Sequence, residues 1–473
     1  MKPTTPVTDL EKPKVSLFAP RRKIYPKLAH GNYRRLKWIL MAFTLGIYYS
    51  VPWLRWDRGA EMPGQAVLLD MAQERFFLFG LEIWPQEFYY VTGLLILASL
   101  GLFLVTALAG RVWCGYFCPQ TVWTDLMIAV ERFWEGDRNA RLRLDSAPLV
   151  KRLLKRSLTH ASWLVIALLT GGAFVFYFAD APTLLPQLIT GSAPNEAYIF
   201  VGIFTFTTYL LGGIAREQVC TYMCPWPRIQ GALVDQDTFL VTYRNYRGEP
   251  RGPHHKGASW EGRGDCVDCR ACVAVCPTGI DIRDGAQLEC LQCALCIDAC
   301  NEIMPRVGRP TGLIAYDTIA NQKAAGGGGV TMPRLLRPRT ILYSSLIAIA
   351  GSIMLIALLL RNDFEVTVLP DRNPLFVRLS NGDVRNGYTL KILNKQYRTR
   401  HFALTLRNPE EGRLSVDNQN TGYLRVPPDI LREFKVYVAV SKNAQNDAVI
   451  LDIHDPVSGA SVTHVASFRR PQG

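Results

Sequence analysis

The sequence predicts a multi-domain membrane protein with three parts: an α-helical transmembrane bundle of about five spans, a small cysteine-rich domain and a C-terminal all-β sandwich. Three observations predict this fold class. Long apolar runs alternate with basic segments across residues 38–361. Eight of the 12 cysteines lie within residues 266–300. Residues 362–473 contain short β-rich runs that are separated by turn sequences.

The composition limits the possible partners. The chain has 473 residues, of which 49% are hydrophobic, and a formal net charge of +13. Its basic residues cluster beside the apolar runs, as they do in the cytoplasmic loops of membrane proteins. We therefore expect a membrane protein and no nucleic-acid partner.

The apolar runs predict the order of the membrane segments. Residues 1–37 contain ten Lys or Arg and two acidic residues, which is typical of a cytoplasmic N-terminal arm. We expect a four-span membrane domain at residues 38–235, and a Gly-rich tether with the fifth span at residues 324–361. The expected spans cover residues 38–53, 88–109, 158–178, 198–215 and 341–360. Five spans with a cytoplasmic N-terminus would place the C-terminus in the periplasm.

A short cysteine motif follows the second and the fourth expected span. Each copy is an arginine followed by C-x3-C-P, with Arg111, Cys114 and Cys118 in the first copy. Arg216, Cys220 and Cys224 form the second copy. This repeat predicts that the four thiols meet at the cytoplasmic end of the bundle, where the two arginines would favour thiolate over thiol. Such thiols could bind Cu(I), zinc or a third iron–sulfur cluster, act as a redox dithiol, or simply pack as small buried residues.

The densest cysteine pattern lies in residues 236–323, which we expect to form a ferredoxin-like cytoplasmic domain. The spacing C-x2-C-x2-C-x3-C occurs twice and is the one that ligates two [4Fe–4S] clusters, with the fourth cysteine of each run serving the other cluster. Zinc sites usually use separated pairs, and disulfides are rare in the cytoplasm. The predicted ligands are Cys266, Cys269, Cys272 and Cys300 for the first cluster, and Cys276, Cys290, Cys293 and Cys296 for the second. Pro277 follows the first run, whereas Asn301 replaces proline after the second.

The C-terminal residues 362–473 are predicted to form an immunoglobulin-like sandwich. About seven short runs of strand-forming residues alternate with turn signals such as Asn381-Gly382-Asp383. The segment contains no cysteine, so its core must hold without a disulfide.

Four sequence features together resemble the CcoG/FixG/RdxA family of cbb3-type cytochrome c oxidase accessory proteins. They are Trp113–Gln120 (WCGYFCPQ), Cys220–Pro227 (CTYMCPWP), the double cluster motif and Gly312–Thr318 (GLIAYDT). The resemblance covers nearly the whole chain. The cysteine motifs alone also resemble those of the wider group of membrane polyferredoxins. The added fifth span and β-domain restrict the resemblance to the CcoG/FixG/RdxA family.

The resemblance implies a cupric reductase that supplies Cu(I) to the oxidase, with Cys114, Cys118, Cys220 and Cys224 as the copper site and two [4Fe–4S] clusters as cofactors. It implies a bacterial inner membrane, a cytoplasmic electron donor, a copper chaperone or transporter, and oxidase assembly factors as partners. A homodimer through the spans is compatible with the sequence. Two alternatives remain: an electron conduit to quinone or to a partner enzyme, and a non-enzymatic assembly scaffold.

Overall fold

The computed structural model describes residues 23–59, 62–255, 257, 259–329, 334–409, 411–417, 423–441 and 447–470. Residues 1–22, most of the predicted N-terminal arm, lie outside the described residues. The chain forms two compact units, one of Met1–Trp56 with Gln65–Gly351 and one of Asp57–Gly64 with Ser352–Gly473. The first unit holds every cysteine of the chain.

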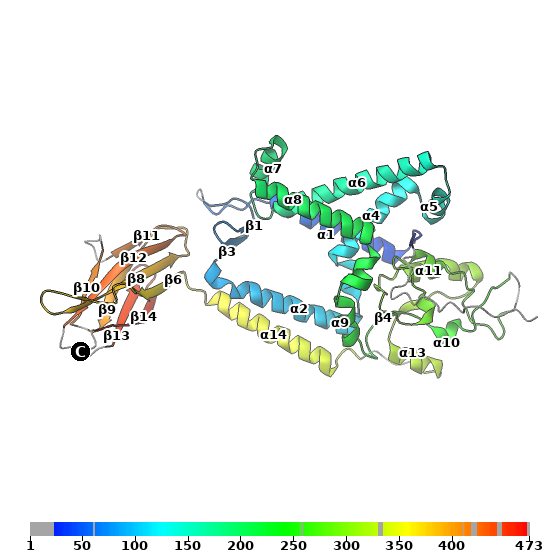
Figure 1. Ribbon diagram of the computed structural model, residues 1–473. Helices are drawn as coiled ribbons and strands as arrows, with labels where there is room; N and C mark the ends of the chain where they lie inside the picture. Colours follow the sequence, from blue (N-terminus) through cyan, green and yellow to red (C-terminus); the bar gives the residue numbers. More distant parts are fainter. Residues whose placement is uncertain are drawn as a thin grey trace, which may run out of the picture. The chain divides into compact units, whose positions relative to one another are not determined.

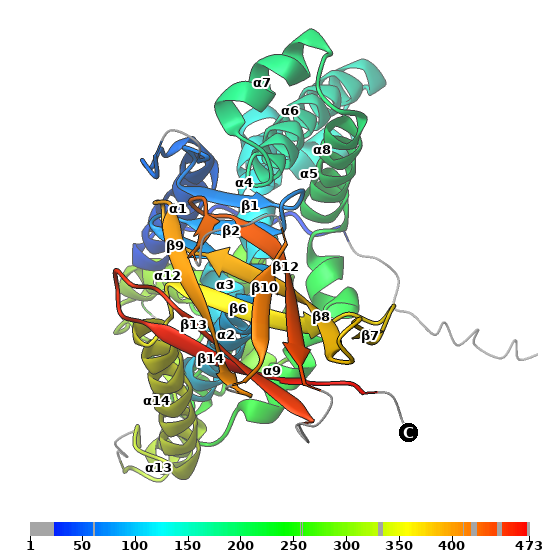
Figure 2. The same cartoon turned by 90° about the vertical axis from the view of Figure 1, so that its left-hand side faces the viewer.

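Four helical segments among the described residues are long and apolar enough to cross a membrane. They are Pro85–Ala109, which contains α2 (Tyr89–Ala109); α6 (Leu149–Val175); Asn195–Ala215, which joins α8 (Asn195–Thr208) to the π-helical η3 (Tyr209–Ala215); and α14 (Pro338–Leu359). Helices α2 and α14 lie side by side in both views (Figure 1 and Figure 2), with the rings of Phe103 and Tyr343 6.0 Å apart. Leucine and isoleucine side chains are exposed along all four segments, as lipid contact requires.

The first expected span corresponds to α1 (Asn32–Ser50), which is not among these four apolar segments. The reason is charge, because Arg34, Arg35 and Lys37 occupy its first two turns. At 1.5 Å per residue its 19 residues still extend roughly 28 Å. Its N-terminal end contacts the cysteine-rich domain, and its far end reaches the end of α6, where Tyr48 Oη donates a hydrogen bond to the Thr170 carbonyl. Helix α1 therefore extends from the cysteine-rich domain to the C-terminal end of α6.

Short elements connect the long helices. Before α2 lie η1 (Val51–Trp53), η2 (Pro85–Glu87) and an antiparallel sheet of β1 (Val67–Asp70), β2 (Arg75–Leu78) and β3 (Leu81–Ile83). After α2 come α3 (Val112–Tyr116), α4 (Pro119–Glu135) and α5 (Arg138–Asp145), and α7 (Ala181–Thr190) precedes α8. After η3 the chain forms the π-helical η4 (Val219–Met223) and α9 (Trp226–Leu233).

The cysteine-rich domain is built on a two-stranded antiparallel sheet of β4 (Leu240–Tyr243) and β5 (Ile314–Asp317). Its helical elements are α10 (Asn245–Gly248), α11 (Ala271–Val275), η5 (Ile282–Asp284), α12 (Leu295–Ile303), η6 (Met304–Val307) and α13 (Ile319–Gly326). Helix α13 is capped at its start by Thr318, which accepts a hydrogen bond from the Asn321 N–H at 3.1 Å, and it continues into the predicted Gly-rich tether as far as Gly326.

An extended N-terminal segment, residues 23–31, lies against the cysteine-rich domain. The Lys27 N–H donates to the Ala274 carbonyl at 2.7 Å, and Ala29 packs among buried residues that include Cys293. The same segment contacts the membrane-domain side, where Tyr25 Oη donates to Asp145 at 2.8 Å. Residues 23–31 therefore join α5 to the cysteine-rich domain.

The C-terminal unit contains two antiparallel sheets that share one apolar core. The first has the order β10-β12-β8-β6, with β7 also paired to β8, and the second has the order β11-β9-β13-β14. The strands are β6 (Phe364–Pro370), β7 (Val377–Arg378), β8 (Val384–Asn394), β9 (Arg400–Asn408), β10 (Arg413–Val416), β11 (Tyr423–Val426), β12 (Leu431–Val440), β13 (Ala448–His454) and β14 (Ser461–Ser467). The sandwich is confirmed, and the predicted runs missed the four-residue strands β10 and β11. Residues that alternate along the strands, such as Tyr388, Leu390 and Ile392 of β8, fill its core.

Candidate metal centres

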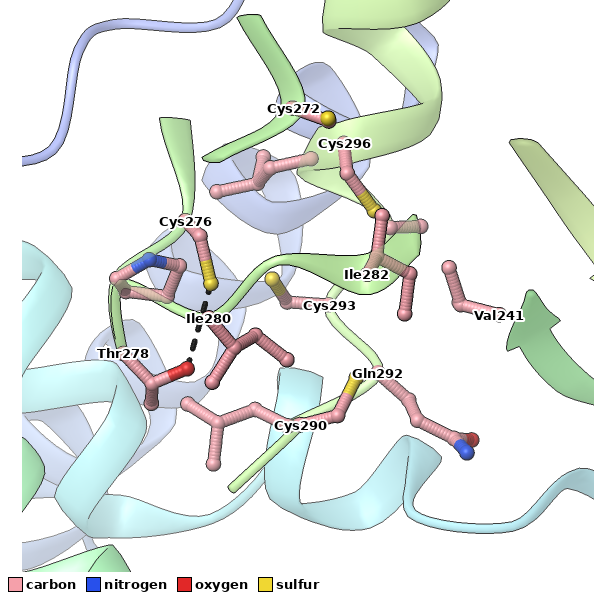
Figure 3. Close-up of a pocket in the computed structure, with 14 residues that line it drawn as sticks. Val241, Cys272, Cys276, Thr278, Ile280, Ile282, Cys290, Gln292, Cys293 and Cys296 are labelled. Atoms are coloured by element: carbon pink, nitrogen blue, oxygen red, sulfur yellow. Dashed lines mark hydrogen bonds between the residues drawn. The ribbon is translucent and has the colours of Figure 1, made fainter. Parts of the chain in front are cut away.

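Four cysteines from both runs surround one cavity in the cysteine-rich domain. Cys290, Cys293 and Cys296 of the second run line it together with Cys276, the fourth cysteine of the first run. Figure 3 shows these side chains pointing toward a shared space, with the Cys276 sulfur 3.3 Å from the Thr278 hydroxyl. The structure therefore brings together the four cysteines predicted for the second cluster.

A neighbouring cavity contains the other predicted set. It is lined by Cys266, Cys269 and Cys272 of the first run and by Cys300 of the second. Cys272 also lines the edge of the first cavity, so the two cavities adjoin. Cys269 is exposed, whereas Cys266 and Cys272 are buried. The exchange of fourth cysteines between the two runs is thus present in the fold.

The backbone around the cysteines repeats between the two runs. Asp268 and Arg270, which flank Cys269, have φ values of 52° and 54°. Gln292 and Ala294, which flank Cys293, have φ values of 54° and 60°. Left-handed conformations are costly for residues other than glycine and occur where a site requires them. Such turns point successive N–H groups inward, a geometry common at iron–sulfur sites.

The second run ends differently from the first because its helix continues. Helix α12 extends beyond Cys300 to Ile303, and a proline at position 301 would interrupt it. The Asn301 side chain accepts a hydrogen bond from the Gly312 N–H at 2.8 Å. Asn301 therefore fixes the segment that leads into β5 instead of ending the helix.

The two C-x3-C-P motifs meet at a third cavity of about 320 Å³. Cys114 lies in α3, and Cys118 precedes Pro119, the first residue of α4. Cys220 lies in η4, and Cys224 ends it. All four thiols line the cavity, whose walls are completed mainly by apolar side chains including Leu102, Trp113, Val219, Trp226 and Leu291. The predicted convergence of the two motifs is therefore present.

One glycine-dependent contact brings the second motif to this position. Gly212 and Gly213 lie in the π-helical η3, and a Cβ at Gly213 would come within 2.8 Å of the Trp163 ring. Trp163 is itself fixed by its indole N–H, which donates to the Met127 carbonyl at 3.0 Å. The π-helical turn therefore packs closely against α6 before the chain reaches Cys220.

The two arginines of the motifs have different roles. Arg111 lines the four-cysteine cavity, whereas Arg216 forms a buried ion pair with Glu131 at 3.0 Å. Glu131 is also paired with Arg141 at 2.6 Å. The charge of Arg216 is thus neutralised within α4 and α5, and Arg216 is absent from the described lining of the four-cysteine cavity.

The charge of Arg111 lowers the pKa of the nearby thiols, as expected, but burial has the larger, opposite effect. Burial raises the pKa of Cys114 to about 11, although the charge of Arg111 opposes that rise. Burial and the neighbouring thiols raise the pKa of Cys220 to about 12. Cys114 and Cys220 are therefore protonated at neutral pH, and a bound soft metal would have to displace their protons.

Among the described residues, no three His, Cys, Asp or Glu side chains approach closely enough to hold a single metal ion. This statement includes the cysteines of all three cavities. Cysteines from both runs line each of the two cavities of the cysteine-rich domain, and four cysteine thiolates are the ligand set of a [4Fe–4S] cluster.

Sequence reasoning missed two residues at the third cavity. Gln230 of α9 is fully buried and accepts a hydrogen bond from the Cys114 thiol at 3.1 Å. Leu291, between two predicted cluster ligands, lines both the second-cluster cavity and the four-cysteine cavity. Gln230 follows the second motif by only a few residues, but no pattern in the sequence distinguished it from a surface glutamine.

Comparison with known families matches most of the chain. A family described as a 4Fe-4S dicluster domain matches residues 215–319, and a family described as a 4Fe-4S binding domain matches residues 91–135. A family described as an IG-like fold at the C-terminal of FixG, putative oxidoreductase, matches residues 354–471.

Full-length relatives extend the match. The chain is 49% identical to the nitrogen fixation protein FixG of Rhizobium meliloti, over 96% of this chain and 94% of that protein. It is 49% identical to protein RdxB of Cereibacter sphaeroides, over 96% of this chain and 97% of that protein. Protein RdxA of the same organism is 54% identical over 82% of this chain and 83% of its own length.

The chain belongs to the FixG/RdxA family. A crystal structure of a FixG-related protein from Vibrio parahaemolyticus matches 23% of this chain and 98% of its own, with 17% identity and a TM-score of 0.21. As a family member with the dicluster domain, the protein contains two [4Fe–4S] clusters and is an iron–sulfur electron-transfer protein of a membrane.

Proposed function

We propose that this protein reduces Cu(II) to Cu(I) for the copper centre of a cbb3-type cytochrome c oxidase. The observation that carries the proposal is the cavity lined by Cys114, Cys118, Cys220 and Cys224, which adjoins the second-cluster cavity through Leu291. The site of the second cluster and the four thiols, which are soft metal ligands, are thus neighbours. Reduction of Cu(II) takes one electron, which a soluble cytoplasmic reductant would supply.

The cysteine-rich domain would hold the two cofactors. We assign Cys266, Cys269, Cys272 and Cys300 to the first cluster, and Cys276, Cys290, Cys293 and Cys296 to the second, following the two cavities. Bound [4Fe–4S] clusters supply single electrons at potentials that depend on hydrogen bonds and solvent exposure.

The four thiols of the third cavity would bind the copper substrate. Thiolates prefer Cu(I) to Cu(II), so binding by these residues favours the reduced product. Arg111 offsets the negative charge that develops when metal displaces the thiol protons, because its guanidinium is buried at the same cavity. The apolar wall, which includes Trp113 and Trp226, limits access of water to bound Cu(I).

The proposed topology follows from the helices. Helix α1 joins the level of the cysteine-rich domain to the far end of α6, and together with the four apolar segments it gives five crossings of a bacterial inner membrane. The N-terminus and the clusters would then be cytoplasmic and the C-terminal sandwich periplasmic. A cytoplasmic electron donor, a copper chaperone or transporter, and oxidase assembly factors are the proposed partners.

A double variant tests the proposal. Cys220→Ser with Cys224→Ser in the full-length protein should abolish Cu(II) reduction by the dithionite-reduced protein, while the visible and EPR spectra of both clusters persist. Tyr222→Phe is the matched control, because the Tyr222 side chain in the same turn is exposed. Wild-type copper reduction in the double variant would refute the copper site, and loss of cluster signals would mean that these cysteines bind iron.

One observation favours a second occupant of the third cavity. The match described as a 4Fe-4S binding domain covers residues 91–135, in which Cys114 and Cys118 are the cysteines. A third [4Fe–4S] cluster there would make the protein an electron conduit to a partner. Metal analysis of anaerobically purified protein separates the two, since two cubanes contribute about eight irons and three contribute about twelve.

A further inference from the structure

The loop from Leu288 to Cys293 separates the second-cluster cavity from the four-cysteine cavity. Leu291 lines both cavities, and Cys290 and Cys293 on either side of it line the first of them. Of the described residues that line the first-cluster cavity, none also lines the four-cysteine cavity. The second cluster site is therefore the immediate neighbour of the four thiols.

Arg111, three residues before Cys114, holds this loop. Its Nη1 donates hydrogen bonds to the carbonyls of Leu288 and Cys290, the latter at 3.1 Å. Its backbone N–H donates to the Gln292 side chain at 3.1 Å. A buried guanidinium that holds two carbonyls fixes their positions more rigidly than one flexible hydrogen bond would.

Two further residues of the first C-x3-C-P turn contact the same loop. Tyr116 Oη donates to the Cys293 carbonyl at 3.3 Å. A Cβ at Gly115 would lie 2.8 Å from the Leu291 carbonyl oxygen and 3.2 Å from the Cys293 Cα. Because these contacts involve backbone atoms, no side chain larger than hydrogen fits at position 115 unless the loop moves away.

Among the described residues Arg111 forms no ion pair with a carboxylate, although the charge of Glu289 acts on it without direct contact. Its side chain is buried, its Nη1 is satisfied by carbonyl groups, and its Nη2 has no hydrogen-bond partner. A buried cation without a counter-ion is costly, so a negative group at the cavity would stabilise it. Metal-bound thiolates would provide that charge.

We propose that Arg111 and Gly115 are positioning residues for the second cluster, so that what binds among the four thiols alters the second cluster and leaves the first unchanged. This inference rests on the proposed function only for the identity of the ligand, Cu(I). The coupling is reciprocal. If Cu(I) binding changes the reduction free energy of the cluster by some amount, reduction of the cluster changes the Cu(I) binding free energy by the same amount.

The experiment is a potentiometric EPR titration of the full-length protein. The variants are Arg111→Gln, Arg111→Lys and Gly115→Ala, with Gly101→Ala as the control, since a Cβ at Gly101 of α2 meets nothing within 4 Å. Without copper, Arg111→Gln and Gly115→Ala should each alter the EPR signal of one cluster. Each should also shift the midpoint potential of that cluster by about 59 mV, which is a tenfold change in equilibrium constant for one electron. Arg111→Lys, which keeps the charge, should restore part of the wild-type value.

Cu(I), added anaerobically as its acetonitrile complex, gives the second readout. In wild-type protein it should shift the same cluster signal that Arg111→Gln alters, and in Arg111→Gln that shift should fall at least about threefold while Cu(I) binding persists. Unchanged signals in both copper-free variants, or equal changes in both clusters, would overturn this inference. A Cu(I) shift of both clusters would also overturn it. Failure of wild-type protein to bind Cu(I), with the copper-free effects intact, would refute the proposed function alone.

Discussion

Replacing Asp455 by asparagine should strongly destabilise the C-terminal sandwich. Asp455 and Arg400 form a buried ion pair, in which the Arg400 Nε donates to the carboxylate at 3.0 Å. The carboxylate also accepts hydrogen bonds from the Val457 N–H at 3.0 Å and the Ser458 hydroxyl at 2.7 Å. Asparagine has nearly the same shape but would leave Arg400 without its counter-charge in the core. Breaking a buried pair in this way typically costs about 3–5 kcal/mol.

The pKa of Asp455 gives an independent magnitude for the free energy by which its ionised carboxylate stabilises the sandwich. Burial raises its pKa, but the hydrogen bonds from Ser458, Arg400 and Val457 outweigh that effect and lower the pKa from 3.8 to about 2. This difference corresponds to about 2 kcal/mol of stabilisation by the ionised group. Because the folded pKa is the lower one, the stabilisation is fully present above pH 3.8 and is lost as the pH falls through 2. Between pH 3.8 and 2, the Asp455→Asn variant should therefore lose less stability than the wild-type protein does.

Pulse proteolysis of the full-length protein in urea measures the unfolding of this domain without isolating it. The control is Asp371→Asn, which removes a partly exposed ion pair with Lys435 at 2.9 Å and should cost at most about 1 kcal/mol. If Asp455→Asn proves no more destabilising than Asp371→Asn, or keeps the wild-type pH dependence, the buried pair does not stabilise the fold as argued.

Three further predictions concern other parts of the chain. Asp298→Ala removes the buried carboxylate that accepts a hydrogen bond from the Arg34 N–H at 2.8 Å at the start of α1, a cap worth about 1 kcal/mol. This variant should release iron to a chelator faster than the control variant Asp284→Ala, in which the replaced side chain is exposed. Leu390→Ala, in the fully buried core of the sandwich, should cost about 2–5 kcal/mol in the same urea assay, and a smaller cost would mean that the core collapses around the gap. Removing iron with an anaerobic chelator should expose residues 236–323 to protease and leave the C-terminal sandwich resistant, because that sandwich has its own core; joint loss of both would contradict this independence.

The sequence predicted the cluster cysteines because their spacing is local. C-x2-C-x2-C-x3-C determines which sulfur atoms one turn can bring together, and the exchange of Cys276 and Cys300 follows from the motif alone. The repeat of an arginine followed by C-x3-C-P likewise predicted that distant thiols would meet. Alternating apolar residues predicted most strands of the sandwich, although strands as short as Arg413–Val416 left too few residues for a period to be seen.

What the sequence did not predict depends on partners far away in the chain. Arg111 and Arg216 each precede a C-x3-C-P motif, yet in the described part of the chain Arg216 pairs with Glu131, whereas Arg111 donates hydrogen bonds to backbone carbonyls. The position of Leu291 between two cavities is set by the close approach of Gly115, which spacing cannot reveal. The sequence placed the first span at residues 38–53, whereas α1 begins at Asn32, where Arg34 and Lys37 pair with the buried Asp125 of α4.

The N-terminal segment of residues 23–31 also bears on the order in which the protein is made. Its contacts with the cysteine-rich domain are with residues synthesised much later, since Lys27 and its acceptor Ala274 are 247 residues apart. At ribosomal rates of about 5–20 residues per second, this separation corresponds to roughly 10–50 seconds. During that interval the segment can contact α5 through Tyr25 but not the cysteine-rich domain, so it can close over α11 and α12 only after all eight cluster cysteines except Cys300 have been translated. The side of α11 and α12 that this segment covers in the finished protein is therefore still open while those cysteines are being made.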